Sequence, residues 1–155
     1  MSLPVYQLVP MDKSHLKQVA ELDKELFSRP WSADSWENEL YNDTVSLVVA
    51  ETEDGCVLGY GVLGVILDEG CLEKLAVRPD CQRQGVAQTI LSSFLRYGEE
   101  HLAYIGLEVR ADNVPALALY EKNGFVAVGR RKNYYAEVNQ DAILMERIFG
   151  GEETP

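Results

Sequence analysis

The segment Leu75–Ala87, which reads Leu-Ala-Val-Arg-Pro-Asp-Cys-Gln-Arg-Gln-Gly-Val-Ala, most constrains what this chain can fold into. It has the pattern of a buried strand end, a tight turn, and a glycine at the start of an amphipathic helix that runs to about His101. The first turn of a helix carries backbone N–H groups without an intrahelical partner and a partial positive charge. Because Gly85 has no side chain, an anion can approach the main chain closely. The segment therefore predicts an anion site at this helix start, with Arg83 as an added cation.

Two common phosphate-binding motifs are absent from this loop. A nucleotide P-loop needs Gly-x4-Gly-Lys-Ser/Thr and a dinucleotide site needs Gly-x-Gly-x-x-Gly, whereas Gln82–Ala87 offers one glycine and no Lys-Ser/Thr pair. Its spacing, Gln-x-x-Gly-x-Ala, resembles instead the pyrophosphate loop of the GCN5-related N-acetyltransferase (GNAT) family, whose pattern is Gln/Arg-x-x-Gly-x-Gly/Ala. That resemblance implies a site for the pyrophosphate of acetyl-coenzyme A (acetyl-CoA). For the loop alone, a helix start that merely contains a glycine is the alternative.

Length, charge and cysteine usage limit the class of protein. With 155 residues, 46% of them hydrophobic, the chain suits one domain, which we expect over 1–149, followed by a disordered tail over 150–155. The net charge of −11 argues against direct binding of nucleic acid, whose phosphates need Lys/Arg surfaces. Without a long apolar run or a signal sequence, we expect a cytoplasmic protein with no membrane contact. Cys56, Cys71 and Cys81 share no metal spacing, so no metal is expected.

Hydrophobic periodicity predicts a single α/β domain with one mixed sheet, in the order β-α-α-β-β-β-α-β-α-β-β. The expected strands are 5–9, 45–51, 57–67, 71–78, 104–109, 125–137 and 142–148. Helices are expected to start near Asp12, at either Ser32 or Asp34, after Gly85 and near Pro115. A turn is expected over 68–70. Strand 71–78, the helix after Gly85 and strand 104–109 form a βαβ unit, which makes the two strands parallel. Glu108 then ends its strand at the sheet edge where ligands bind in open α/β sheets.

Two side chains could carry acyl transfer from a thioester to an amine. The attacking nitrogen must be neutral, and the departing thiolate benefits from a proton. Glu108 is the candidate base, acting directly or through a water, and a carboxylate paired with Arg110 or with solvent is the alternative. Tyr120 could give the thiolate a proton, and a half-buried aromatic on a helix face is the alternative. The residues alone leave both assignments open.

The segment Leu107–Phe125 resembles the ribosomal-protein-alanine N-acetyltransferases, the RimI type of the GNAT family, in its Leu-Glu-Val-Arg, Asn, Ala-Leu-Tyr and Gly-Phe motifs. The resemblance extends to Pro30-Trp31-Ser32, to Arg131-Lys-Asn-Tyr134-Tyr135 and to Asp141-Ala142. It implies that Glu108 is the base and Tyr120 the acid. It also implies cofactor contacts from Leu75, Ala76, Val77, Arg83, Gln84, Gly85, Val86, Ala87, Gln88 and Asn113.

Three aromatic side chains are candidates for an acceptor groove. Tyr134 and Tyr135 could line it with Trp31 opposite, although two aromatics at a strand bend more often serve packing.

Glu73 and Lys74 bring more charge into the strand beside the cofactor than the resemblance leads us to expect. Some relatives in the wider family place their base on this strand, so Glu73 is the alternative base.

These features predict an acetyl-CoA-dependent Nα-acetyltransferase that acts on a protein N-terminus. The resemblance implies the N-terminal alanine of a small-subunit ribosomal protein as the acceptor. Acetylation of a lysine side chain or a small amine at the same site is one alternative. A non-catalytic acyl-CoA-binding module is another, and Glu108, Asn113 and Tyr120 argue against it because a pure binding module needs only the phosphate loop. The oligomeric state stays open.

Overall fold

The structure, a computed structural model, describes residues 3–150 and divides into two compact units. The first unit holds the chain up to Gly64 together with Lys74–Phe94, and the second holds Val65–Glu73 and the chain from Leu95 onward. The single domain expected over 1–149 stays a prediction. Apart from Gly150, the tail that we expected to be disordered lies outside the described residues.

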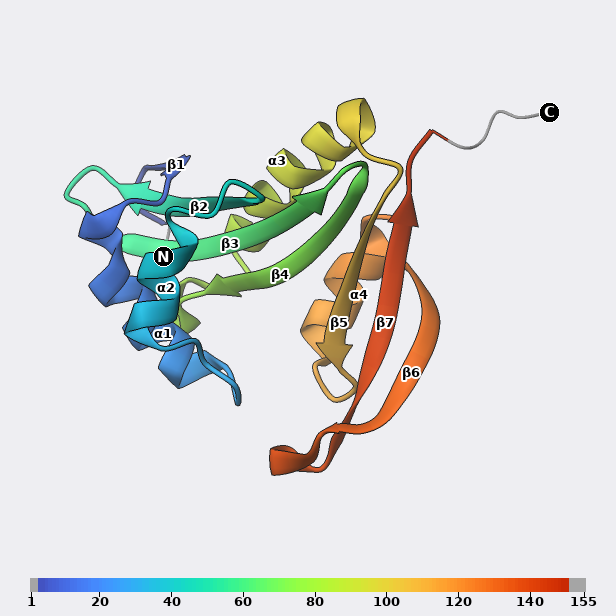
Figure 1. Cartoon of the computed structure of the whole chain (residues 1–155). Helices are drawn as coiled ribbons and strands as arrows, with labels where there is room; N and C mark the ends of the chain where they lie inside the picture. The colour runs from blue at the N-terminus through green and yellow to red at the C-terminus, as the bar shows by residue number, and fades with distance from the viewer. Residues whose placement is uncertain (1–2, 151–155) are drawn as a thin grey trace. The chain divides into compact units, whose positions relative to one another are not determined.

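The helices and strands follow the predicted order, with short 3-10 turns added between them (Figure 1). The strands are β1 Tyr6–Pro10, β2 Val45–Thr52, β3 Val57–Ile66, β4 Glu69–Val77, β5 Tyr104–Arg110, β6 Val126–Tyr135 and β7 Gln140–Ile148. The helices are α1 Leu16–Leu26, α2 Ala33–Glu39, α3 Val86–His101 and α4 Val114–Lys122. Hydrogen bonds order the strands β1-β2-β3-β4-β5-β7-β6, and this mixed sheet confirms the predicted α/β class. Within residues 3–150, no helix has the length and apolar content needed to cross a membrane.

Local side chains begin the first helices where the sequence predicted. Asp12 Oδ1 accepts the Ser14 N–H at 2.9 Å, and His15 Nδ1 accepts the Asp12 N–H at 3.0 Å, which completes a capping box ahead of α1. Ser32 Oγ accepts the Ser35 N–H at 3.1 Å and caps α2. These bonds satisfy amides that a helix start leaves without partners, so both helix starts are determined locally.

Two boundaries differ from the prediction. The chain turns between β3 and β4 at Leu67 and Asp68, whereas the turn expected over 68–70 falls largely inside β4. Leu67 has a left-handed φ of +57° and is 93% exposed. Leucine seldom adopts this conformation, so its propensity gives no signal for the turn. The strand expected over 125–137 ends at Tyr135, where a 3-10 turn over Ala136–Val138 begins.

In the first unit, β3 presents different side chains to two helical layers. Tyr60 and Val62 are fully buried in a core that also contains side chains of α1 and α2. Gly61 faces α3, because a Cβ added there would lie 2.7 Å from Ile90 and 2.9 Å from the ring of Phe94. This glycine lets α3 pack closely against the strand; Figure 1 shows α3 behind β3. The apolar face predicted for α3 is buried: Ile90, Leu91, Phe94 and Leu95.

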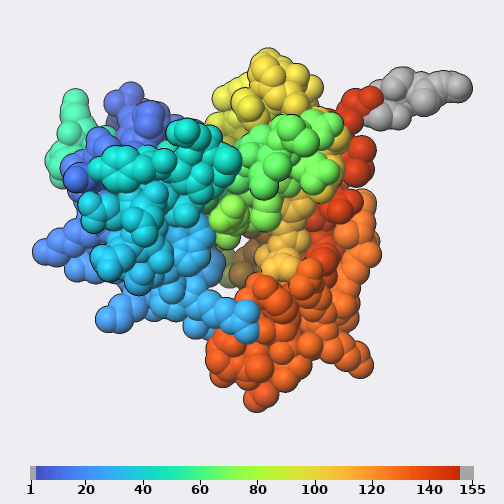
Figure 2. Space-filling model, in the orientation of Figure 1, coloured from blue at the N-terminus to red at the C-terminus, as the bar shows by residue number. Residues whose placement is uncertain are grey.

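In the second unit, β5, β7 and β6 pair antiparallel, and β4 joins them through a short parallel pairing. Glu69–Cys71 of β4 pair with Tyr104–Gly106 of β5, which confirms the predicted parallel strands of the βαβ unit. β5 pairs with β7 along its whole length. β6 is exposed over most of its length, and its register against β7 shifts between Arg131 and Tyr135. Figure 2 shows this β6 and β7 surface (orange to red) open to view.

Replacing Gly59 by alanine should destabilise the first unit. An added Cβ would lie 2.7 Å from the backbone oxygen of Ala76, which cannot move without shifting β4. We expect the free energy of unfolding to fall by about 1–3 kcal/mol, the usual cost of overpacking, in a urea titration. Gly129→Ala is the matched control, because its Cβ would meet only Leu144, at 3.9 Å, and should change stability by less than about 0.5 kcal/mol. Equal stability of the two variants would contradict the close approach of β3 and β4.

Candidate active site

The loop between β4 and α3, in the first unit, has the backbone of an anion site. Arg83 and Gly85 take left-handed φ values of +64° and +92° on either side of Gln84. Turns of this kind direct successive N–H groups toward one concave side. The first bond of α3 runs from the Thr89 N–H to the Gly85 oxygen at 3.0 Å, so the amides of residues 86–88 precede the helical ladder. The loop therefore offers several N–H groups and one guanidinium.

The strand end ahead of this loop is held by hydrogen bonds. Gln82 Nε2 donates to the Val77 oxygen at 3.1 Å, and the Arg78 N–H donates to the Leu58 oxygen at 2.8 Å. Ala76 and Val77 are buried and Leu75 is partly buried. Main-chain groups are what this strand can offer a ligand, and the cofactor contacts predicted for it stay predictions.

In the second unit, Glu108 lies on the open side of β5, between two buried neighbours. Its Oε2 lies 3.4 Å from Arg131 Nε, and its side chain is 33% exposed. Arg110, the partner that the sequence suggested, instead donates two hydrogen bonds of 3.0 and 2.9 Å to Asp112. The pairing with Arg110 was therefore wrong, and the guanidinium beside Glu108 comes from β6.

The carboxylates of Glu73, which is the alternative base, and of Glu108 both influence the pKa of the Cys71 thiol. Desolvation raises the pKa of Cys71, and the negative charges of Glu73 and Glu108 raise it further. Both carboxylates are therefore within electrostatic range of Cys71. A thiol with a raised pKa stays protonated at neutral pH and is a poor nucleophile. The carboxylates, rather than this thiol, are the groups that could take a proton here.

Tyr120 is buried, whereas the alternative interpretation of the sequence was a half-buried aromatic on a helix face. It is 8% exposed, and its ring packs edge-on against Phe125 with the centroids 5.6 Å apart. Burial raises the pKa of the Tyr120 phenol, and the nearby Tyr135 raises it further. The phenol therefore keeps its proton at neutral pH, and transferring that proton to a thiolate is more uphill than for an ordinary tyrosine.

Asn113 has a structural task at the start of α4. Its Oδ1 accepts the Ala116 N–H at 3.2 Å, which caps the helix, and Pro115 occupies the first turn as the sequence predicted. Since Oδ1 already holds this bond, the cofactor contact expected from Asn113 stays a prediction that its other polar groups would have to fulfil.

Tyr134 and Tyr135 lie at an irregular part of β6 that Asp141 holds in place. Asp141 Oδ1 accepts the Asn133 N–H, and Oδ2 accepts the Arg130 Nε–H, both at 2.7 Å. Asn133 has a left-handed φ of +51° at the register shift. The two tyrosine rings pack edge to face with centroids 5.1 Å apart. The aromatic pair is thus fixed by a carboxylate on the neighbouring strand.

Arg131 is the residue whose role the sequence did not reveal. Its guanidinium lies beside Glu108 and also 5.5 Å from the centre of the Tyr134 ring. It therefore connects the candidate base to the candidate acceptor-binding aromatics within the second unit. The motif Arg-x-x-Tyr-Tyr was the available signal, but it gave no indication that its arginine pairs with Glu108 of another strand.

Trp31 lies in the first unit, in the segment that joins α1 and α2. The Trp31 side chain is partly buried, and its ring centroid lies 4.6 Å from that of Trp36. The backbone N–H of Trp31 donates to Asp23 Oδ2 at 2.7 Å. Tyr134 and Tyr135 belong to the second unit, so their facing Trp31 across a groove stays a prediction.

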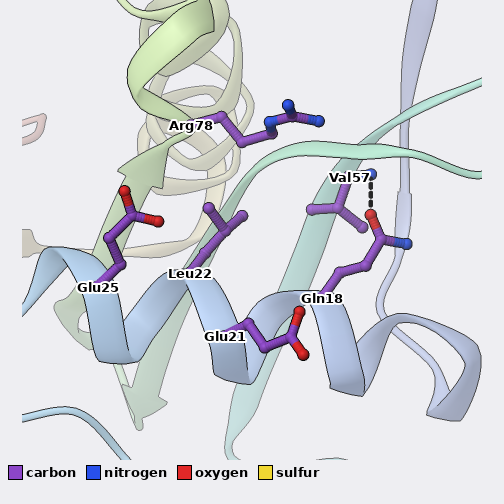
Figure 3. Close-up of a pocket in the computed structure, with 6 residues that line it drawn as sticks. All are labelled: Gln18, Glu21, Leu22, Glu25, Val57 and Arg78. Atoms are coloured by element: carbon purple, nitrogen blue, oxygen red, sulfur yellow. Dashed lines mark hydrogen bonds between the residues drawn. The ribbon is translucent and has the colours of Figure 1, made fainter.

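A surface pocket of about 260 Å³ in the first unit contains none of the predicted site residues. Figure 3 shows its lining, which consists of Gln18, Glu21, Leu22, Glu25, Val57 and Arg78. The Gln18 amide is already used, because Oε1 accepts the Val57 N–H at 2.8 Å. Across residues 3–150, no three His, Cys, Asp or Glu side chains gather as a metal site would require.

Comparison with known proteins identifies relatives over most of the chain. Residues 16–125 match the model of the acetyltransferase (GNAT) family. The ribosomal protein bS18-alanine N-acetyltransferase of Escherichia coli is 31% identical over 87% of this chain and 92% of its own length. The N-alpha-acetyltransferase RimI of Mycobacterium tuberculosis is 31% identical over 90% of both chains. The crystal structure of the Escherichia coli enzyme superposes with a TM-score of 0.84 at 29% identity, covering 97% of this chain and 99% of that chain.

Asp141→Asn should destabilise the protein at neutral pH, because it weakens the hydrogen bonds that hold β6 at its register shift between Arg131 and Tyr135. Hydrogen bonds from the Asn133 N–H and from Arg130 lower the pKa of Asp141. A carboxylate with a depressed folded pKa adds stability above its unfolded pKa of ~3.9 and loses that stability as pH falls through the folded value. The free energy of unfolding of the variant should therefore lie below that of the wild type at pH 7, and this difference should shrink below about pH 4. Denaturant titrations at pH 7 and at a pH below about 4 measure it. Asp43→Asn, at an exposed position, is the control; a deficit for Asp141→Asn that is independent of pH would contradict this role.

Proposed function

This chain belongs to the acetyltransferase (GNAT) family, and we propose that within it the protein is an acetyl-CoA-dependent Nα-acetyltransferase acting on the N-terminal alanine of a small-subunit ribosomal protein. The observation that carries this proposal is the 31% identity to the Escherichia coli bS18-alanine N-acetyltransferase over most of both chains. Such an acceptor is made in the cytoplasm, so the proposal includes a cytoplasmic location.

The β4–α3 loop suits the pyrophosphate of acetyl-CoA. The left-handed residues Arg83 and Gly85 and the amides that precede the helical ladder of α3 form a positive concave backbone, which favours an anion. A Cβ added at Gly85 would meet no described atom within 4 Å, so the space beside it is open to a ligand. Acetyl-CoA would supply the acetyl group as a thioester.

Glu108 is the proposed general base. In the reaction a bond forms between the acceptor nitrogen and the acetyl carbon, the carbon–sulfur bond breaks, and the nitrogen loses a proton. Glu108 is accessible on the open side of β5 and can take that proton directly or through a water. The Arg131 guanidinium, 3.4 Å away, holds the carboxylate in one direction. Glu73 remains the alternative base on the neighbouring strand.

Tyr120 is the proposed acid for the departing thiolate. Its phenol is protonated at neutral pH, and burial raises its pKa further, so the proton is present when the thiolate forms. Because the raised pKa makes a separate transfer uphill, we expect the proton to move as the carbon–sulfur bond breaks. The pairing of a base on β5 with an acid on α4 supports catalysis over simple acyl-CoA binding.

Proton energetics favour an N-terminal amine as the acceptor. An α-amino group has a pKa of ~7.7–8.0 and a lysine amine ~10.4, so deprotonating lysine costs about 3–4 kcal/mol more. A carboxylate base suits the easier task. Tyr134, Tyr135 and Trp31 are proposed to hold the peptide, because each offers a flat apolar ring together with a polar group.

Gly85→Val should weaken acetyl-CoA binding at least tenfold, or about 1.4 kcal/mol, because its side chain would fill the space beside the loop amides. Isothermal titration calorimetry measures the change. Gly55→Val is the matched control, since Gly55 has a similar φ of +88° and equally open surroundings but lies in the β2–β3 turn. Equal loss of affinity in the two folded variants would place the cofactor elsewhere.

Glu108→Gln should lower kcat by about 10²-fold or more, the usual effect of losing a general base, with acetyl-CoA affinity unchanged. Tyr120→Phe should lower kcat in the same way. The kcat of each variant is measured in stopped assays that detect the free thiol of the CoA product. A damaging Glu73→Gln together with a silent Glu108→Gln would transfer the role of base to Glu73.

A peptide that begins with alanine and carries one internal lysine tests the proposed function itself. Mass spectrometry of the product should locate the acetyl group on the N-terminal amine, and a peptide blocked at its N-terminus should react far more slowly. Acetyl predominantly on the lysine side chain would contradict the Nα assignment. An absence of turnover with intact acetyl-CoA binding would favour a binding module.

A further inference from the structure

A buried ion pair in the first unit accounts for the unexpected lysine in β4. Asp23 of α1 is fully buried and Lys74 is 6% exposed. The Lys74 Nζ lies 2.9 and 2.8 Å from the two carboxylate oxygens of Asp23. Burial lowers the pKa of Lys74, whereas the hydrogen bonds and charge of Asp23 raise it. Removing either partner would leave a buried charge without compensation.

The Asp23 carboxylate is satisfied by two further donors. The Tyr60 hydroxyl donates to Oδ1 at 2.9 Å, and the Trp31 N–H donates to Oδ2 at 2.7 Å. Each oxygen thus receives one bond from Lys74 and one from another residue. The Trp31 bond is to the backbone, so the carboxylate fixes the main chain of the segment between α1 and α2.

The Lys74 ammonium is also surrounded by aromatic rings. The ring centres of Phe27, Trp31 and Trp36 lie 4.2, 4.8 and 5.9 Å from Nζ. Cations are attracted to such ring faces, most strongly where water is excluded. Phe27 and Trp31 both belong to the segment between α1 and α2. One ammonium group therefore holds this segment through the Asp23 carboxylate and through two of its rings.

We propose that Lys74 is a positioning residue for the acceptor peptide: its buried ammonium fixes the Phe27–Trp31 segment and thereby sets acceptor affinity. This inference rests on the proposed function, in which Trp31 contacts the acceptor. The rings of Phe27, Trp31 and Trp36 form a cage that the Lys74 ammonium already occupies. A cationic group of the acceptor is therefore excluded from it, and an acceptor can contact only the exposed part of the partly buried Trp31 side chain.

The test is chemical rescue of Lys74→Ala. The variant lacks three carbons and the ammonium, which n-propylammonium supplies, whereas n-propanol supplies the carbons and a neutral hydroxyl. We expect the KM for an alanine-started peptide to rise about tenfold or more, with kcat less affected and acetyl-CoA affinity unchanged, as expected for lost acceptor binding. Added n-propylammonium should restore KM and n-propanol should not. Lys24→Ala, at an exposed position of α1, is the matched control and should behave like wild type.

Intrinsic fluorescence gives a second readout that is independent of catalysis. Trp31 and Trp36 are the only tryptophans of the chain, so its tryptophan emission reports on this cage. Acrylamide quenching should increase in Lys74→Ala and return toward the wild-type value with n-propylammonium. This result without any peptide acetylation by the wild type would mean that the proposed function has failed while the cage has not.

Two results would overturn the inference. The first is a folded Lys74→Ala variant with an unchanged peptide KM, whatever the quenching shows. The second is a loss confined to acetyl-CoA affinity. If Lys74→Ala does not fold, Tyr60→Phe removes one donor to Asp23 and leaves the ion pair in place. It should raise the peptide KM by a smaller factor, and an unchanged KM would overturn the proposal.

Discussion

A carboxylate removed from water must be paired, and in the first unit this requirement falls on Asp23. Lys74 of β4, Tyr60 of β3 and the Trp31 backbone all meet at its two oxygens. Helix α1, two strands and the following segment are therefore tied to one group. A hydrophobic contact would hold them together without direction, whereas hydrogen bonds to a fixed carboxylate also specify how the segment lies. The same group thus connects the packing of the unit to the placement of Trp31.

The second unit applies the same constraint nearer to its surface. Asp141 fixes the left-handed Asn133, and this sets the course of β6 before Tyr134 and Tyr135. Arg131, from the same part of β6, lies beside Glu108. Carboxylates on β5 and β7 are in this way linked by two consecutive arginines, Arg130 and Arg131. The geometry of the proposed base therefore depends on an irregular edge strand rather than on β5 alone.

The elements could be predicted from the sequence because their signals are local. Apolar spacing, the capping residues Asp12 and Ser32, and Pro115 in the first turn of α4 all act within a few residues. The turn at Leu67 could not, because a leucine with positive φ is imposed by the strands that it joins.

Candidate site residues were predictable by type but not by partner. Glu108 was recognised, yet its neighbour is Arg131 rather than Arg110, because the pairing of β6 with β7 brings a residue distant in sequence near β5. Lys74 attracted notice only as an excess charge, since its partner Asp23 lies 51 positions earlier. The raised pKa of Tyr120 likewise depends on burial of its ring, which packs against Phe125, and on the nearby Tyr135, and both arise only in the folded chain.

The proposed Nα-acetylation is tested in cells by the mass of ribosomal protein bS18 from an Escherichia coli strain that lacks its own bS18-alanine N-acetyltransferase and expresses this protein instead. We expect one acetyl group on the N-terminal alanine, present with the wild-type chain and absent with Glu108→Gln at equal abundance. Unmodified bS18 in cells that contain the folded wild-type protein would contradict it.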